Sequence, residues 1–210
     1  MNIGFVAARL EGTDGVSLES KKWRDVFERM GHTCFCFCSR TDWPEERAAL
    51  AEEASLAHED VWEIHEALFK RRRRTDETGK RVSALKQKLK GRIRDFVKRY
   101  KVDVIVVENA MSLPMNLPLG LAAAEFIAES GIATVAHHHD FWWERTRYSG
   151  SPAEDYLRAA FPLTLSAIQH VVINSVAERE LAFRTGVKSR LVPNVMDFAH
   201  PPPDDDAYAD

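Results

Sequence analysis

Three consecutive histidines and an aspartate, His137 to Asp140, are the residues of this chain best suited to chemistry. An imidazole can donate or accept a proton near neutral pH, or bind a metal ion, and a neighbouring carboxylate can orient it. The run directly follows the apolar segment 132–136, which predicts a buried strand. If strand geometry continues, His137 and His139 share one face and His138 takes the other. This pattern predicts a ligand site at the carboxyl end of the strand.

The residues around the histidines are compatible with several kinds of ligand. A metal ion would need a third and a fourth ligand, and no spacing in the sequence supports them, so we expect no metal and no other cofactor. Two tryptophans and two arginines follow the aspartate: Trp142, Trp143, Arg145 and Arg147. The indole rings could stack on a sugar or belong to the core. The guanidinium groups could bind phosphate or lie on the surface.

Other polar residues also follow predicted strands. The loop after the first strand contains Gly12 and Gly15, and Ser17 is expected to cap the helix that comes next. Such a loop lets a ligand approach a helix N-terminus, although it matches neither the dinucleotide-binding nor the P-loop pattern, so a simple glycine turn is the alternative. Asn109 and Asn174 come after two later strands. All of these residues are expected at one edge of the sheet, where ligands bind.

Strand and helix patterns alternate along the chain. Apolar runs predict strands at 2–8, 33–38, 103–108, 132–136, 170–173 and 189–192. Helices are predicted at 17–30, within 44–100 with a break near 75–79, and at 119–130, 152–168 and 175–185. The strands are continuously apolar, which indicates burial on both faces. We therefore expect an α/β fold with a Rossmann-like parallel sheet of about six or seven strands, helices on both faces and a basic helical insertion.

Charge is unevenly distributed in this chain of 210 residues and net charge -3. Residues 70–101 hold 15 Lys and Arg against three acids, a net charge of +12. This segment predicts a solvated helix face or, as the alternative, a contact with an anionic membrane surface. Aromatic residues do not alternate with its charges, and it matches no known nucleic-acid-binding motif, so no nucleic-acid partner is expected. Neither a signal peptide nor a membrane span is recognisable, and the prediction is a cytoplasmic protein.

The three cysteines alternate along one predicted strand, at Cys34, Cys36 and Cys38. Their side chains therefore share a face, and neighbours are spaced by about 6.6 Å along the strand. That spacing does not suit a disulfide between neighbours. Buried free thiols in a reducing compartment are expected, with a metal or redox role as the alternative.

Four stretches, in this order, resemble a known family. They are Gly12 to Ser20 before the helix that ends at Gly31, His138 to Asp140, Val171 to Ser175, and Val192 to Asp197. Together they resemble the amino-terminal half of retaining glycosyltransferases with the GT-B fold, of the family 4 type. The last stretch is similar to the family's Val-Pro-Asn-Gly-Val-Asp, except that Val195-Met196 replaces Gly-Val.

The resemblance implies a Rossmann-like acceptor-side domain over residues 1–198, with the helical segment 44–100 inside it and a linker at 199–210. The whole enzyme would move a sugar from a nucleotide-sugar donor to a sugar or other hydroxyl acceptor. Most donor contacts would come from a second domain that this chain lacks, so the isolated chain is expected to be inactive.

The resemblance also implies roles for particular residues. His138, His139 and Asp140 are expected to be catalytic at the transferred sugar. Substrate-binding roles are expected for Gly12, Asp14, Gly15, Asn109, Arg145 and Asn174. In the full-length enzyme, His138→Ala is then predicted to abolish activity without unfolding the protein. The alternatives are a non-catalytic sugar- or nucleotide-binding or assembly module, and one half of a GT-B-like sugar-nucleotide epimerase.

Overall fold

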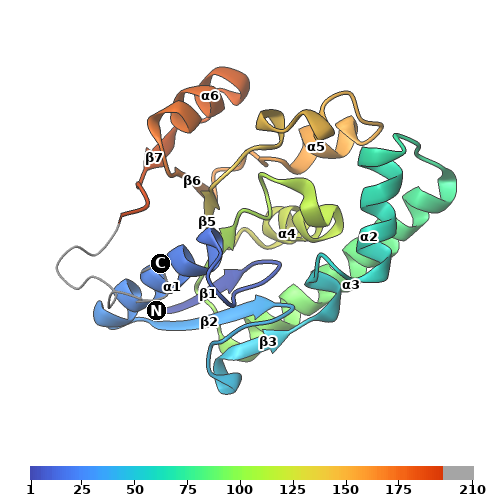
Figure 1. Ribbon diagram of the computed structural model, residues 1–210. Coiled ribbons are helices and arrows are strands. Elements are labelled where there is room, and N and C mark those ends of the chain that lie inside the picture. Colours follow the sequence, from blue (N-terminus) through green and yellow to red (C-terminus); the bar gives the residue numbers. More distant parts are fainter. Residues whose placement is uncertain (196–210) are drawn as a thin grey trace, which may run out of the picture.

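A single parallel sheet organises residues 1–195, the part of the chain that the computed structural model describes (Figure 1). Its seven strands are β1 (Asn2–Val6), β2 (Thr33–Cys38), β3 (Ala48–Leu50), β4 (Val104–Glu108), β5 (Ala133–His138), β6 (Ile168–Val172) and β7 (Ser189–Leu191). They lie in the order β3-β2-β1-β4-β5-β6-β7, and every neighbouring pair is parallel. The predicted fold class is confirmed.

Helices cover both faces of the sheet. They are α1 (Gly15–Arg29), α2 (Glu59–His65), α3 (Asp76–Tyr100), α4 (Leu117–Ser130), α5 (Glu154–Ala160) and α6 (Ser175–Thr185). Helix α1 covers one face, where its residues Trp23 and Phe27 pack on side chains of β1 and β2. Helices α2 to α5 bury the larger apolar cluster on the opposite face. Figure 1 shows α6 and β3 at opposite ends of the molecule, as the strand order requires.

The prediction of buried free thiols is confirmed in the described structure. Cys34, Cys36 and Cys38 are free, buried and part of the same apolar cluster under α1. Burial raises the pKa of the Cys34 thiol to about 12, so this thiol is protonated and unreactive at neutral pH.

The start of α1 differs from the prediction. Asp14, not Ser17, is the N-cap, and its Oδ1 accepts from the backbone N–H groups of Val16 and Ser17, both at 3.2 Å. Aspartate is a strong cap because its carboxylate satisfies free N–H groups and favours the positive end of the helix dipole. The Ser17 hydroxyl instead donates to Asp14 Oδ2 at 2.8 Å. A residue expected to bind substrate thus also holds the helix start.

The segment 44–100 was predicted to contain helices and no strand, and the structure differs from this prediction. It contains β3, which pairs with β2 in the register Cys36–Ala48. The sequence Ala-Ala-Leu has no strand pattern of its own, so this short edge strand forms through its partner. The predicted helix break also shifts: α3 begins at Asp76 behind the N-cap Thr75, and Gly79 lies inside the helix.

The predicted helix 152–168 is much shorter in the structure. Helix α5 ends at Ala160, and β6 already begins at Ile168. Pro162 has no N–H and cannot continue a helix. The chain after Pro162 instead leads to strand β6, whose first residue, Ile168, pairs with Thr134 of β5.

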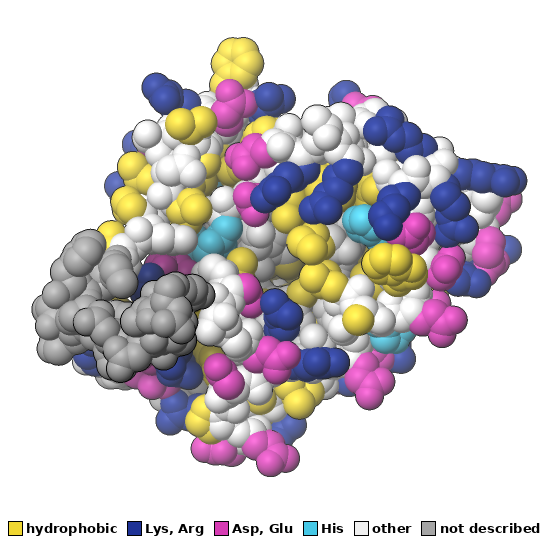
Figure 2. Space-filling model, viewed as in Figure 1, with side chains coloured by type: hydrophobic (Ala, Val, Ile, Leu, Met, Phe, Trp, Pro, Cys, Tyr) yellow, Lys and Arg dark blue, Asp and Glu magenta, His cyan; other side chains and the backbone are white. Residues whose placement is uncertain are grey.

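The basic segment 70–101 is largely neutralised by acids from elsewhere in the chain. Nine of its Lys and Arg residues pair with acids outside the segment: Lys70, Arg71, Arg74, Arg81, Lys86, Lys88, Lys90, Arg92 and Arg94. Figure 2 shows Lys and Arg side chains gathered over the region between α2 and α5. No helix within residues 1–195 has the length and apolar character needed to cross a membrane. The predicted linker 199–210 lies outside the described residues.

Candidate functional site

A cleft of about 360 Å³ opens at the carboxyl edge of the sheet. It lies between the ends of β1 and β2 and the loop after β4. Its polar lining comes from Arg9, Asp14, Ser39, Arg40, Ser55, Asn109 and Asn116. The loop after β1 contributes Gly12 to an adjoining hollow, where a φ of +78° demands glycine. The edge therefore offers guanidinium, amide and hydroxyl groups to a polar ligand.

Asn109 joins this cleft to the histidine run. Its backbone is left-handed, with φ +56°, a conformation that Asn tolerates better than most residues. Its Oδ1 accepts from the backbone N–H groups of His139 at 3.0 Å and Asp140 at 3.2 Å. The structure thus brings Asp14, Asn109, His139 and Asp140 to one edge, because β1, β4 and β5 are neighbours whose carboxyl ends meet there.

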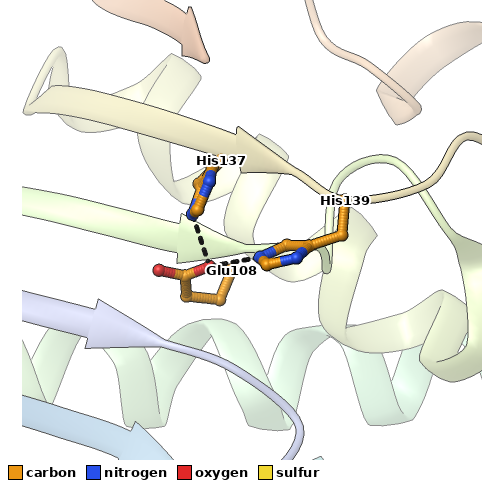
Figure 3. Close-up of side chains that lie close together, drawn as sticks. All are labelled: Glu108, His137 and His139. Carbon is orange, nitrogen blue, oxygen red and sulfur yellow. Dashed lines mark hydrogen bonds and ion pairs between the residues drawn. The ribbon is translucent and has the colours of Figure 1, made fainter. Parts of the chain in front are cut away.

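A buried carboxylate lies between two of the histidines. Oε2 of Glu108, at the end of β4, is 2.9 Å from His137 Nδ1 and 3.3 Å from His139 Nε2 (Figure 3). Burial works to raise the pKa of Glu108, but the hydrogen bonds from His137 and His139 outweigh it and hold that pKa below its usual value. Glu108 is therefore ionised at neutral pH and orients both imidazoles.

His138 lies on the opposite face of β5, as strand alternation predicts. It is 1 % exposed, and its Nε2 is 2.9 Å from Nδ1 of His170 in β6. Burial lowers the pKa of His138 well below its usual value and lowers the pKa of His170 to about 4. Both rings are therefore neutral at pH 7. The structure does not bring the side chain of His138 to the edge where His139 and Asp140 lie.

Asp140 and Arg145 form an ion pair at that edge. The Arg145 guanidinium lies 3.0 Å from Asp140 Oδ1, and their side chains are 47 % and 34 % exposed. Gly15 begins α1 beside the N-cap Asp14. The Asp14 carboxylate also accepts from Arg9 at 3.0 Å. These groups combine solvent access with fixed orientation, as substrate contacts require.

Three of the other residues singled out in the sequence have structural partners. Asn174 caps α6 by accepting from the backbone N–H of Ala177 at 2.8 Å. The indole of Trp142 donates to the Phe161 carbonyl at 2.8 Å. Trp143 stacks on Phe141. None of these contacts requires a ligand.

Sequence reasoning missed Glu108 and His170 as partners of the histidines. Glu108 is the last residue of the predicted strand 103–108. Aligning the ends of the neighbouring strands would have placed it near the histidine run, since Glu108 pairs in register with His137. The sequence offered no comparable signal for His170, because its register with β5 depends on where β6 begins. Arg9 and Arg40 were missed because surface arginines are common.

The sequence of this chain is similar to that of known glycosyltransferases. The sequence model of Glycosyltransferase Family 4 matches residues 24–200. Mannosylglucosylglycerate synthase of Petrotoga mobilis is 32% identical over 94% of this chain and 46% of its own length. The protein of the same name from Thermotoga maritima is 33% identical over 99% of this chain and 48% of its own. The chain spans about half the length of these curated relatives.

Two solved structures are more distant. An alpha-glucosyltransferase in complex with UDP is 16% identical, with a TM-score of 0.38 over 96% of this chain and 42% of its own. A structure described as alpha-glucosyltransferase with UDP and mismatched DNA is 15% identical, with a TM-score of 0.36 over 81% of this chain and 36% of its own.

Proposed function

Since the chain belongs to glycosyltransferase family 4, we propose that it is the amino-terminal, acceptor-side domain of an enzyme that transfers a sugar from a nucleotide-sugar donor to a hydroxyl group. The family match over residues 24–200 carries this proposal. The polar cleft at the carboxyl edge of the sheet supports it, because α/β folds bind their ligands there. A second domain would close over the cleft and hold most of the donor.

We assign the contact with the transferred sugar to His139 and Asp140. Both lie at the carboxyl edge of the sheet, where Asn109, which lines the cleft, fixes their backbone. Gly12, Asp14 and Gly15 would lie at the junction of donor and acceptor. Arg145 would act on Asp140 through their ion pair.

His138 and Asn174, which the sequence also predicted to act on the substrates, are assigned structural roles. The burial of His138 against His170 favours a role in holding β5 in place. The capping bond of Asn174 favours a role in the fold of α6.

The chemistry in this domain would be positional and electrostatic. Glu108 fixes the ring of His139, and a fixed ring can hold the sugar or the acceptor hydroxyl near the reacting carbon. Dipoles aimed at the departing diphosphate lower the barrier because charge develops there. Retention of anomeric configuration is what the resemblance to retaining glycosyltransferases implies, and we include it in the proposal.

The acceptor is proposed to be small and anionic. The relatives' name, mannosylglucosylglycerate synthase, describes a product that contains glycerate, which bears a carboxylate. Two guanidinium groups, those of Arg9 and Arg40, line the cleft beside hydroxyl and amide groups. Arginine suits carboxylates because it can bind both oxygens at once.

A transfer assay tests the proposal. The full-length protein that carries this chain is incubated with GDP-mannose or UDP-glucose and with glucosylglycerate, and the product is identified by mass and by the anomeric coupling in proton NMR. The expected result is a new glycoside with retained configuration. Epimerised nucleotide sugar without transfer would favour the epimerase alternative, and no turnover with any donor would favour the binding-module alternative.

The proposed roles of the basic segment and the cellular location are secondary. The many ion pairs of residues 70–101 favour a structural role over contact with a membrane. Sedimentation of the protein with phosphatidylserine vesicles at physiological salt tests this, and binding that salt weakens would support the membrane alternative. A cytoplasmic location and the absence of a nucleic-acid partner stay predictions.

A further inference from the structure

Glu108, His137 and His139 place three candidate metal ligands together. One candidate ligand atom from each of the three side chains lies within 4.8 Å of the other two. Figure 3 shows both imidazoles pointing at the carboxylate from β5 and the residue after it, while Glu108 comes from the neighbouring β4. The three atoms therefore converge on one point from two strands of the rigid sheet.

The carboxylate of this cluster is deeply buried. The side chains of Glu108 and His137 are 0% exposed, and that of His139 is 8% exposed. No Lys or Arg within residues 1–195 forms an ion pair with Glu108. The neighbours of this buried carboxylate are thus imidazoles, and a buried carboxylate without a fixed counter-charge is costly.

The polar atoms of the cluster are also not all satisfied. Within the described structure, Glu108 Oε1 is buried and has no hydrogen-bond partner. Buried polar atoms usually have partners, so an orphan atom suggests a missing water or ion. A bound cation would take up the carboxylate charge.

The donor set selects the kind of cation. Two imidazole nitrogens and one carboxylate oxygen suit borderline transition metals such as zinc, and they do not suit magnesium or calcium, which prefer oxygen ligands. Zinc lies about 2.0–2.2 Å from such atoms, which puts tetrahedral ligands about 3.4 Å apart. The observed separations from Glu108 Oε2, 2.9 Å and 3.3 Å, are slightly shorter. A small outward movement of the carboxylate would admit the ion.

Surrounding side chains hold two of these ligands in place. Trp23 of α1 stacks on the ring of His137, with centroids 4.4 Å apart. Asn109 accepts from the backbone N–H of His139. A site with preset ligands loses less conformational entropy when it binds a metal.

We propose that Glu108, His137 and His139 form a binding site for one divalent transition-metal cation of the zinc class. His137 coordinates through Nδ1 and His139 through Nε2, with a water molecule in the fourth position on the exposed side of His139. The site shares His139 with the proposed sugar contact. It does not depend on sugar transfer, and it is tested by metal binding alone.

Calorimetry with the full-length protein tests the site directly. The protein is stripped with a chelator and titrated with Zn²⁺, and with Co²⁺ to follow visible absorption. One ion per chain with micromolar or tighter affinity is expected, and Co²⁺ should give the intense bands of four-coordination. Glu108→Gln and His139→Ala should each weaken binding at least about 100-fold, because each removes a ligand. Absence of stoichiometric binding by the folded wild type overturns the proposal.

A matched control separates this site from other histidines. His32 precedes β2 at the amino edge of the sheet, so His32→Gln should bind Zn²⁺ like the wild type. Full binding by folded Glu108→Gln, or its loss in His32→Gln, would overturn the assignment.

X-ray absorption of the zinc-loaded wild type decides the matter if the variants do not fold. Nitrogen and oxygen neighbours at about 2.0–2.2 Å are expected. A sulfur shell at about 2.3 Å would place the ion at the cysteine cluster instead and refute the proposal.

Discussion

The two faces of β5 present the same residue type in opposite settings. On the α1 face, His137 and His139 bond to an ionised carboxylate, and Asn109, which lines the cleft, holds the backbone of His139. On the other face, His138 bonds to another imidazole inside the apolar core. Adjacent histidines therefore differ in their hydrogen-bond partners and in the face of the sheet that they occupy. The difference shows that the neighbours across the sheet, rather than the residue type, decide which histidine is available for chemistry.

The comparison is tested most severely by removing the imidazole of His139, which follows β5 at the carboxyl edge of the sheet. In the full-length protein, His139→Ala is expected to lower kcat/KM for sugar transfer at least about 100-fold, since a positioned polar contact in the transition state is lost. Initial rates measure this, and circular dichroism checks the fold. A folded variant with wild-type rates would remove His139 from the proposed site.

The buried pair should make stability depend on pH. His170 has a pKa of about 4 in the folded protein, below its usual 6.5, because burial disfavours the charged ring. The unfolded chain therefore binds this proton first. The stabilising contribution is complete above pH 6.5 and is lost as pH falls from 6.5 to 4, by about 3 kcal/mol.

Urea unfolding at several pH values measures this loss. The variant His170→Gln keeps a hydrogen-bonding side chain and lacks the titration, so it should show a shallower slope between pH 6.5 and 4. Equal slopes in both proteins would contradict the burial argument.

Removing the buried imidazole should affect folding rather than turnover. His138→Ala leaves a cavity in the core and an unpaired His170, and we expect a loss of about 2 kcal/mol in the free energy of unfolding. The rate of sugar transfer per folded molecule should stay within about twofold of the wild type, given that the ring does not reach the cleft. A folded His138→Ala protein without activity would instead restore the catalytic role expected from the sequence.

Asn109 and Asn174 both follow strands, and they too differ in whether their contacts serve the proposed site or only the fold. Asn174→Ala removes only a helix cap and should cost about 1 kcal/mol of stability with little effect on turnover. Asn109→Ala frees the backbone of His139 and Asp140, so it should lower the transfer rate more than it lowers the melting temperature. Parallel thermal melts and rate measurements compare the pair, and identical profiles would show that the two residues do not differ in role.

Local patterns in the sequence were sufficient for much of the fold. Apolar runs located six of the seven strands, and the alternation of strands with helices indicated a parallel sheet. Strand periodicity also separated His138 from His137 and His139. These features depend on residues close together along the chain, which is why the sequence alone reveals them.

Contacts between distant residues were decided only by the tertiary structure. The short strand β3 exists because β2 pairs with it. Asp14 and Ser17 could both cap α1, and the point at which the chain enters the helix decides for Asp14. Glu108 meets His137 through the register of β4 and β5, and His138 meets His170 through that of β5 and β6. The sequence therefore determined which residues could do chemistry. Strand register determined which of them have a carboxylate beside them and which are enclosed in the core, because only pairing in space sets those neighbours.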